Sequence, residues 1–170
     1  MKKYDLIVLG AGSGGLSVAA GACNLGLKVL MIEKNKLGGD CLWNGCIPSK
    51  TLIHEAEKLM IAKQENFSYD PDTHFREAIK RIKMVQVEIA KTDSVERFTN
   101  LGVDVKIGEG KFYSKNKIVV GKEYFKFKKC VVATGSRPKI PENFKSIEFL
   151  TNEDFFHLEK LSEDSSISLQ

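Results

Sequence analysis

The chain has 170 residues, of which 42% are hydrophobic and 28% are charged. This composition excludes an intrinsically disordered protein and allows one domain with a real core. The formal net charge is +4, but no nucleic-acid-binding motif accompanies the lysines of residues 106–129, so we expect a solvated sheet face there and no nucleic-acid partner. Four cysteines in this length do not suggest a secreted disulfide scaffold.

The N-terminus can be read in two ways. Lys2 and Lys3, followed by an apolar run, resemble the start of a signal peptide, yet Asp5 interrupts that run and the glycines of residues 10–15 break any apolar helix. No apolar run approaches the length of a membrane span. We therefore expect a cytoplasmic protein with no membrane partner.

The first 33 residues have the pattern of a βαβ unit. Residues 4–9 are a nearly continuous apolar run, as expected of a buried parallel strand. Residues 10–15 read Gly-Ala-Gly-Ser-Gly-Gly, residues 16–25 have small and apolar side chains at helical spacing, and residues 28–32 form a second apolar run. Glu33 follows that second strand, which completes the unit.

Each part of this unit suits a bound dinucleotide. Gly10 allows a tight turn, Gly12 lets the backbone approach a pyrophosphate, and Gly15 lets the helix pack closely on the strand. The helix N-terminus offers free N–H groups and partial positive charge to phosphates. Glu33 can accept hydrogen bonds from ribose hydroxyls. The motif indicates dinucleotide binding, but it does not separate FAD from NAD.

Residues 38–50 read Gly-Gly-Asp-Cys-Leu-Trp-Asn-Gly-Cys-Ile-Pro-Ser-Lys and hold two cysteines, Cys41 and Cys46. Five helical steps advance about 7.5 Å, whereas a disulfide needs Cα atoms within roughly 7 Å, so a regular helix through both cysteines would hold them too far apart. The glycines allow a bend, and Pro48 biases Ile47 away from helical angles. We expect a bent segment that closes a small Cys41–Cys46 ring at the start of a helix continuing through Lys50.

A ring of this kind is suited to redox chemistry. The positive end of the helix and Lys50, one turn beyond Cys46, both favour a thiolate, and a strained, exposed disulfide with a stabilised thiolate is easily reduced. Two other interpretations exist: the cysteines are incidental, or they bind zinc with His54 as a third ligand. Since the chain lacks a second cysteine pair at metal-ligand spacing, we expect no metal site.

The rest of the chain alternates helices and short strands. We predict that Cys23 and Cys130 are inert packing residues and that His54 and His74 are surface histidines or histidines with satisfied hydrogen bonds. The periodicity predicts helices over residues 51–64 and 74–100 with a turn at 69–72, an antiparallel meander of strands 103–107, 117–120 and 124–127, a buried strand 129–133, a strand 146–150, a short helix capped near Thr151 or Asn152, and a frayed tail.

With these pieces placed, the chain resembles the FAD domain of the class I pyridine nucleotide-disulfide oxidoreductases, the flavoprotein disulfide reductases. Four ordered signals carry the resemblance: the glycine loop with Glu33, the cysteine segment, the meander, and Ala133-Thr134-Gly135. The Gly-Gly-Asp-Cys-Leu-Trp stretch and residues 93–98 look most like the mercuric reductase and dihydrolipoamide dehydrogenase branch. This chain departs from many relatives, which have Thr in place of Asp40 and Asn-Val in place of Trp43-Asn44.

The resemblance implies a role for each matching residue. Cys46 would be the charge-transfer thiol nearest the flavin, Cys41 the interchange thiol that attacks substrate, and Lys50 a neighbour of the flavin ring. The catalytic residues would be Cys41, Cys46 and Lys50. The cofactor-binding residues would be Gly10, Gly12, Ser13, Gly14, Gly15, Glu33, Lys34, Gly39, Asp40, Cys41, Cys46, Lys50, Gly110, Ala133, Thr134 and Gly135.

The resemblance also implies a fold and a reaction. The fold is α/β and Rossmann-like, with a parallel sheet covered by helices on one face and by a three-stranded antiparallel meander on the other. Residues 1–160 would form the N-terminal part of an FAD-binding domain, and residues 161–170 a frayed tail. Electrons would pass from NAD(P)H through FAD to Cys41 and Cys46, and then to a disulfide, dithiol or metal-ion substrate.

Relatives continue into an NAD(P)H-binding domain and a dimer-interface domain, and neither pattern occurs in this chain. We therefore expect the first part of a larger, homodimeric enzyme that is incomplete for turnover alone. Two alternatives stay open. One is an NAD(P)-binding Rossmann module with incidental cysteines, and the other is a non-catalytic thiol-switch domain that keeps the fold without the flavin.

Overall fold

The structure is a computed structural model that describes residues 2–64, 70–144 and 146–160. The chain divides into two compact units, one built from residues 1–43 and 88–137 and the other from residues 44–87 and 138–170. The predicted frayed tail, residues 161–170, lies outside the described residues, and so does Tyr69 of the predicted turn. Within the described ranges, no helix combines the length and the apolar character that crossing a bilayer requires.

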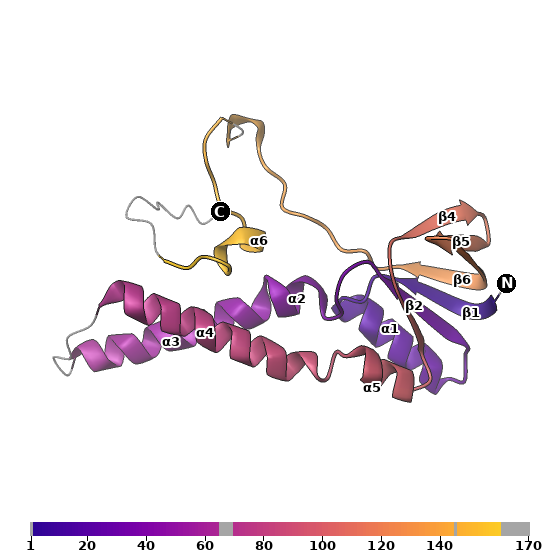
Figure 1. The fold of residues 1–170 in the computed structure, drawn as a ribbon, viewed down its shortest axis with the longest axis horizontal. Helices are drawn as coiled ribbons and strands as arrows, with labels where there is room; N and C mark the ends of the chain where they lie inside the picture. Colours follow the sequence, from indigo (N-terminus) through magenta and orange to yellow (C-terminus); the bar gives the residue numbers. More distant parts are fainter. Residues whose placement is uncertain (1, 65–69, 145, 161–170) are drawn as a thin grey trace. The chain divides into compact units, whose positions relative to one another are not determined.

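One six-stranded sheet forms the centre of the first unit (Figure 1). Its strands lie in the order β3-β2-β1-β6-β5-β4. The strands β3, β2, β1 and β6 run parallel to one another, whereas β5 runs antiparallel to β6 and β4 antiparallel to β5. The bounds are β1 Lys2–Leu9, β2 Val29–Glu33, β3 Asp104–Ile107, β4 Gly110–Ser114, β5 Lys117–Val120 and β6 Glu123–Val132.

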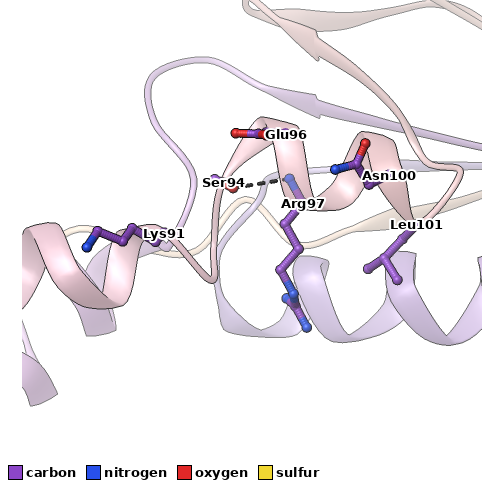
Figure 2. Close-up of a pocket in the computed structure, with 6 residues that line it drawn as sticks. All are labelled: Lys91, Ser94, Glu96, Arg97, Asn100 and Leu101. Atoms are coloured by element: carbon purple, nitrogen blue, oxygen red, sulfur yellow. Dashed lines mark hydrogen bonds between the residues drawn. The ribbon is translucent and has the colours of Figure 1, made fainter.

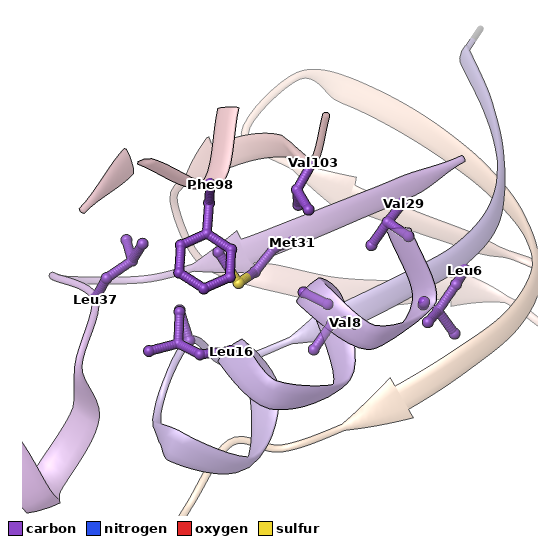
Figure 3. Packing of buried hydrophobic residues seen from close by; sticks show 11 residues of the cluster. Leu6, Val8, Leu16, Val29, Met31, Leu37, Phe98 and Val103 are labelled. Carbon is purple, nitrogen blue, oxygen red and sulfur yellow. The ribbon is translucent and has the colours of Figure 1, made fainter. Parts of the chain in front are cut away.

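Successive side chains of β1 and β2 point to opposite faces of the sheet and are apolar on both, so the two strands contribute to two separate hydrophobic cores. On one face, β1 and β2 pack against the helix α1 (Ser13–Asn24) and the ring of Phe98 (Figure 3). On the other face they pack against the meander β4-β5-β6. The first core includes Leu6, Val8, Leu16, Val29, Met31 and Phe98, and the second includes Ile7, Leu9, Leu30, Ile32, Ile118 and Phe125. The predicted α/β, Rossmann-like class is confirmed, with helices on one face and a meander on the other.

The strand predictions for the first unit need three corrections. Residues 103–107 are not the first strand of the meander, because β3 pairs in parallel with β2. The strand that completes the meander is β4, whose glycine-rich start hid it in the sequence. The predicted strands 124–127 and 129–133 are one strand, β6, whose first half pairs with β5 and whose second half extends along β1.

Two long helices, α3 (Cys46–Gln64) and α4 (Pro71–Ala90), form most of the second unit (Figure 1). Phe75, Ile79 and Ile82 of α4 bury their side chains together with Phe156, and Leu52 of α3 packs against them. The short helix α6 (Asn152–Phe155) has the predicted cap, since Thr151 and Asp154 form a capping box. Residues 146–150 are not a strand: a 3₁₀ turn, Glu142–Phe144, precedes them, and the Ile147 N–H closes a turn on the Phe144 carbonyl at 3.2 Å.

The predicted helix 74–100 is two helices. The first, α4, begins three residues earlier than predicted because Asp70 accepts a hydrogen bond from the Thr73 N–H at 3.0 Å and Pro71 suits a first helical position. Hydrogen bonds from Thr73 also hold the pKa of the Asp70 carboxyl below its ordinary value. The second helix, α5 (Val95–Asn100), has its own N-cap, because Ser94 Oγ accepts the Arg97 N–H at 3.1 Å. The serine side chain can bond to nearby backbone groups in place of the helical hydrogen bonds, which favours a break between α4 and α5 at this position.

This cap gives a stability prediction. Ser94→Ala should lower the free energy of unfolding by about 1 kcal/mol because one N–H at the start of α5 loses its acceptor. Ser94→Asp should retain most of the stability, since a carboxylate accepts the same bond. Urea unfolding of both variants measures the difference, and equal losses in the two would show that the side chain does not cap α5.

Candidate functional site

The glycine loop lies between β1 and α1, where the backbone turns sharply at Gly10. The Gly10 N–H donates to the Ile32 carbonyl at 2.8 Å, and the φ angle of +97° is one that side chains disfavour. A Cβ at Gly10 would lie 2.2 Å from the Ala133 carbonyl oxygen, and a Cβ at Gly15 would lie 1.9 Å from the Gly10 carbonyl oxygen. The sequence places glycine at both positions because the loop, α1 and the chain after β6 are in backbone contact.

The N-terminus of α1 is suited to an anion. Gly12 occupies the N-cap position, no side chain of the described residues caps this end, and the first turn contains no acidic residue. The first N–H groups of a helix have no partner within the helix, and the helix dipole favours negative charge there. Ser13 and Gly14 are exposed, and open space surrounds the Cβ position of Gly14. This end of α1 can therefore accept a phosphate group.

Glu33 stands at the end of β2, beside the glycine loop. Its Oε2 accepts the Ala11 N–H at 2.7 Å and its Oε1 accepts the Asn35 N–H at 2.9 Å. A carboxylate has about four lone-pair positions, so it can still accept hydroxyl donors. Lys34, the next residue, is exposed. Glu33 thus fixes the shape of the loop and also presents an acceptor at the same strand end.

The start of the cysteine segment, residues 38–43 with Cys41, packs directly against the glycine loop. The Gly38 N–H donates to the Ala11 carbonyl at 2.9 Å, and Gly12 forms a parallel bridge with Gly38. Gly39 has a φ angle of +61°, and a Cβ there would lie 2.5 Å from Gly12 Cα. The structure therefore brings together two motifs that are more than twenty residues apart in the sequence.

Cys41 lies in the short helix α2 (Gly39–Trp43), which follows this contact. Its side chain is half-buried, whereas Asp40 is exposed in the first turn. An acidic residue in the first turn of a helix complements the helix dipole, which gives Asp40 a structural reason to be there. Leu42 is buried, and its side chain occupies the space that a Cβ at Gly38 would need.

Trp43 folds back against Lys36 and Leu37, the residues that precede α2. The sequence alone predicted no role for Trp43 or Lys36. The Trp43 Nε1–H donates to the Leu37 carbonyl at 2.7 Å, and Lys36 Nζ lies 3.3 Å from the centroid of the indole ring. The signal available in the sequence was the only tryptophan of the chain beside a cysteine. Its partners could not be inferred without the turn that folds residue 36 back over residue 43.

Cys46 and Lys50 belong to the second unit and lie one turn apart at the start of α3. Both are exposed, and residues four apart on a helix share a face. The expectation that Ile47 avoids helical angles was wrong, because α3 already includes it. Pro48 sits in the first turn, where its missing N–H would have no partner within the helix. All four cysteines are described as thiols, and the Cys41–Cys46 disulfide stays a prediction.

The remaining predicted residues lie near the same strand ends. Gly110 begins β4, and a Cβ there would lie 2.7 Å from a methyl group of Leu9. The Ala133 N–H donates to the Leu9 carbonyl at 2.7 Å, which places Ala133 beside Gly10. Thr134 and Gly135 follow and are exposed. The first unit thus gathers the glycine loop, Glu33, the Cys41 segment, Gly110 and Ala133 at one edge of the sheet.

Two hollows in the first unit lie outside this set. The first, about 350 Å³, lies beside α5 and is lined by Lys91, Ser94, Glu96, Arg97, Asn100 and Leu101 (Figure 2). The second, about 640 Å³, lies after β3, and the two neighbours of Gly110, Glu109 and Lys111, line it. Within the part of the chain that the structure describes, no three His, Cys, Asp or Glu side chains are grouped to hold a metal ion.

Comparison with known proteins identifies a family and several relatives of this chain. The profile of the family described as pyridine nucleotide-disulphide oxidoreductase matches residues 4–170. Dihydrolipoyl dehydrogenase 3 of Haloarcula marismortui is 37% identical over 145 residues, 79% of this chain and 30% of that protein. Mercuric reductase of Bacillus cereus is 31% identical over 170 residues, 93% of this chain and 26% of that protein.

A solved structure has the same fold. The Cu(II) complex of the HOCl-induced flavoprotein disulfide reductase RclA from Escherichia coli superposes with a TM-score of 0.69 at 26% identity, covering 84% of this chain and 31% of that one. The chain thus spans 31% or less of the length of each of these three proteins.

The close packing at Gly15 is testable against its neighbour. Gly15→Ala should destabilise the chain by about 2 kcal/mol or more, because the new Cβ meets the Gly10 carbonyl. Gly14→Ala meets open space and should raise stability by up to about 1 kcal/mol, since alanine favours a helix. Thermal and urea unfolding compare the two variants. Similar effects at both positions would contradict the described contact between the loop and α1.

Proposed function

Because the chain belongs to the pyridine nucleotide-disulphide oxidoreductases, we propose that it is the FAD-binding, dithiol-bearing portion of an NAD(P)H-dependent flavoprotein oxidoreductase. In this proposal Cys41 and Cys46 interconvert between a dithiol and a disulfide. The observation that carries the proposal is the docking of the Cys41 segment on the glycine loop, through the Gly38–Ala11 hydrogen bond and the Gly12–Gly39 contact.

The residues of the first unit fit a dinucleotide cofactor. The uncapped N-terminus of α1 and the glycine at position 12 would hold the pyrophosphate, and Glu33 would accept ribose hydroxyls. Gly110, Ala133, Thr134 and Gly135 would line the path of the cofactor, together with Ser13, Gly14, Lys34, Gly39 and Asp40. The family depends on FAD with NAD(P)H as co-substrate. When bound, FAD supplies the hydride-accepting, two-electron chemistry that amino-acid side chains lack.

The two thiols account for the substrate half of the reaction. With a disulfide substrate, the Cys41 thiolate attacks one substrate sulfur, a mixed disulfide forms, and the first substrate thiolate leaves and takes up a proton. The Cys46 sulfur then attacks Cys41, the intramolecular disulfide closes, and the second substrate thiolate leaves. Two electrons reach the substrate in total. Lys50, on the same face of α3 as Cys46, would favour the charged thiolate.

The substrate class stays open within this proposal. A disulfide, a dithiol or a metal ion each exchanges two electrons with such a pair, and the relatives include both dihydrolipoyl dehydrogenases and mercuric reductases. The roles of Cys41, Cys46 and Lys50, a homodimeric whole enzyme and a cytoplasmic location are further parts of the proposal.

The first test measures cofactor binding. In Gly12→Ala the new Cβ would lie 3.6 Å from Gly39 Cα, which is an ordinary van der Waals contact. The added methyl group would, however, reduce the space that the proposed pyrophosphate needs beside the loop backbone. It should weaken FAD binding by about tenfold or more, which is about 1.4 kcal/mol. Gly21→Ala, the same change at an exposed position near the C-terminal end of α1, should leave binding unchanged.

Titration of the 170-residue chain with FAD, followed by flavin fluorescence, gives both affinities. Protein that stays colourless and binds NAD(P) instead of FAD would favour the plain Rossmann module. Protein that binds neither would favour a thiol switch.

The second test counts thiols. The reduced chain should show four thiols in denaturant, and oxidation by one equivalent of a small disulfide should remove those of Cys41 and Cys46. Cys41→Ser and Cys46→Ser should each prevent formation of the intramolecular disulfide. A variant with both Cys23 and Cys130 changed to Ser is the matched control, and oxidation should still remove its two remaining thiols, those of Cys41 and Cys46. A disulfide that involves Cys23 or Cys130 would contradict the assignment.

A further inference from the structure

The helix α2, which contains Cys41, is too short to be stable by itself. It has five residues, and isolated helices shorter than about 12 residues are marginal in water. Contacts outside the helix must therefore hold it in place. At its N-terminal end, Gly38 and Gly39 dock on the glycine loop. At its C-terminal end the contacts come from Trp43.

Trp43 makes two contacts with residues that precede α2. Its Nε1–H donates to the Leu37 carbonyl at 2.7 Å, and its ring lies under the Lys36 ammonium at 3.3 Å from the centroid. Both contacts join the end of α2 to the chain before its beginning, so residues 36–43 form a closed loop that contains Cys41. Leu37 itself is buried with Phe98 and Leu16, which anchors the loop to the core of the first unit (Figure 3).

We propose that Lys36 and Trp43 are positioning residues that clasp α2 and thereby set the exposure and direction of the Cys41 thiol. This inference rests on the proposed function for its consequence in catalysis, because a thiol that attacks a substrate must be held in one geometry. The cation–π contact contributes most where the ammonium is partly desolvated. Burial lowers the pKa of Lys36 from its ordinary value, which agrees with a partly desolvated ammonium on the ring.

The two contacts can be tested separately, because the charge of Lys36 and the Nε1–H donor of Trp43 can each be removed by one substitution. Lys36→Met keeps the alkyl stem and removes the charge, and Lys36→Arg restores a cation that stacks on an aromatic ring. Trp43→Phe keeps a ring and removes the Nε1–H donor. The Lys36 variants should fold because Lys36 is exposed, and Trp43→Phe should fold because Trp43 is only half-buried and lies outside the core clusters of the described residues.

The measurement is the alkylation rate of each cysteine by iodoacetamide in the reduced 170-residue chain, resolved by peptide mass spectrometry. Lys36→Met and Trp43→Phe should each raise the rate at Cys41 by about threefold or more, because a frayed α2 exposes a thiol that is now half-buried. Lys36→Arg should restore the original rate. Cys23, whose Sγ donates to the Leu101 carbonyl, and Cys130, whose pKa is raised by burial, serve as internal controls and should not change.

Trp43 also supplies a spectroscopic signal, since it is the only tryptophan. Lys36→Met should shift its emission to longer wavelength as the ring loses its cover, and Lys36→Arg should reverse the shift. An unchanged or lower Cys41 rate, or equal rises at Cys23, Cys41 and Cys130, would overturn the clasp. None of these readouts requires flavin, so a chain that fails to bind FAD yet shows the predicted rates would refute the proposed function and leave the clasp standing.

Discussion

The arrangement of the site depends on a close approach of two backbones, at Gly12 and Gly39. Neither residue has a Cβ, and a Cβ at position 39 would lie 2.5 Å from the neighbouring Cα, a distance that no ordinary side chain tolerates. The approach lets the Gly38 N–H donate to the Ala11 carbonyl, while the Ala11 N–H donates to the Glu33 carboxylate. One short peptide unit therefore links the second strand, the glycine loop and the segment of Cys41.

The sheet supplies the rigid base for this linkage. Because β1 is buried on both faces, its end is fixed by two cores, one with α1 and one with the meander. Gly10 follows directly from that end and contacts the chain after β6. Active-site segments are positioned most accurately when they extend from such buried elements. Parallel strands also bring their carboxyl ends to one edge, and for this reason Glu33 and Ala133 lie beside the loop although they are a hundred residues apart in sequence.

The sequence sufficed to predict the parts of the fold that local patterns determine. The first strand β1, the helix α1, the interruption of the helix at residues 44–45 before Cys46 and the cap at Thr151 all follow from short-range residue chemistry. The failures have a common cause, because each depended on a partner distant in sequence. The pairing of β3 with β2, the merging of two predicted strands in β6 and the absence of a strand at 146–150 are decided by which neighbours are available. The contact of Lys36 with Trp43 belongs to the same class, since a tertiary turn brings them together.

The docked segment also bears on the competing interpretations of the cysteines. In a plain nucleotide-binding module, residues 38–43 would be an ordinary loop after the second strand, with no need for two consecutive glycines. Here the contact with the glycine loop requires glycine at position 39, and the buried side chain of Leu42 together with a positive φ angle requires it at position 38. Cys41 follows Gly39 by two residues, in the short helix α2. A packing role alone would explain Gly38, Gly39 and the buried Leu42, but it gives no reason for a half-buried thiol between Asp40 and Leu42. Under the proposed function these residues share one requirement, which is to hold the Cys41 sulfur at a fixed place beside the glycine loop.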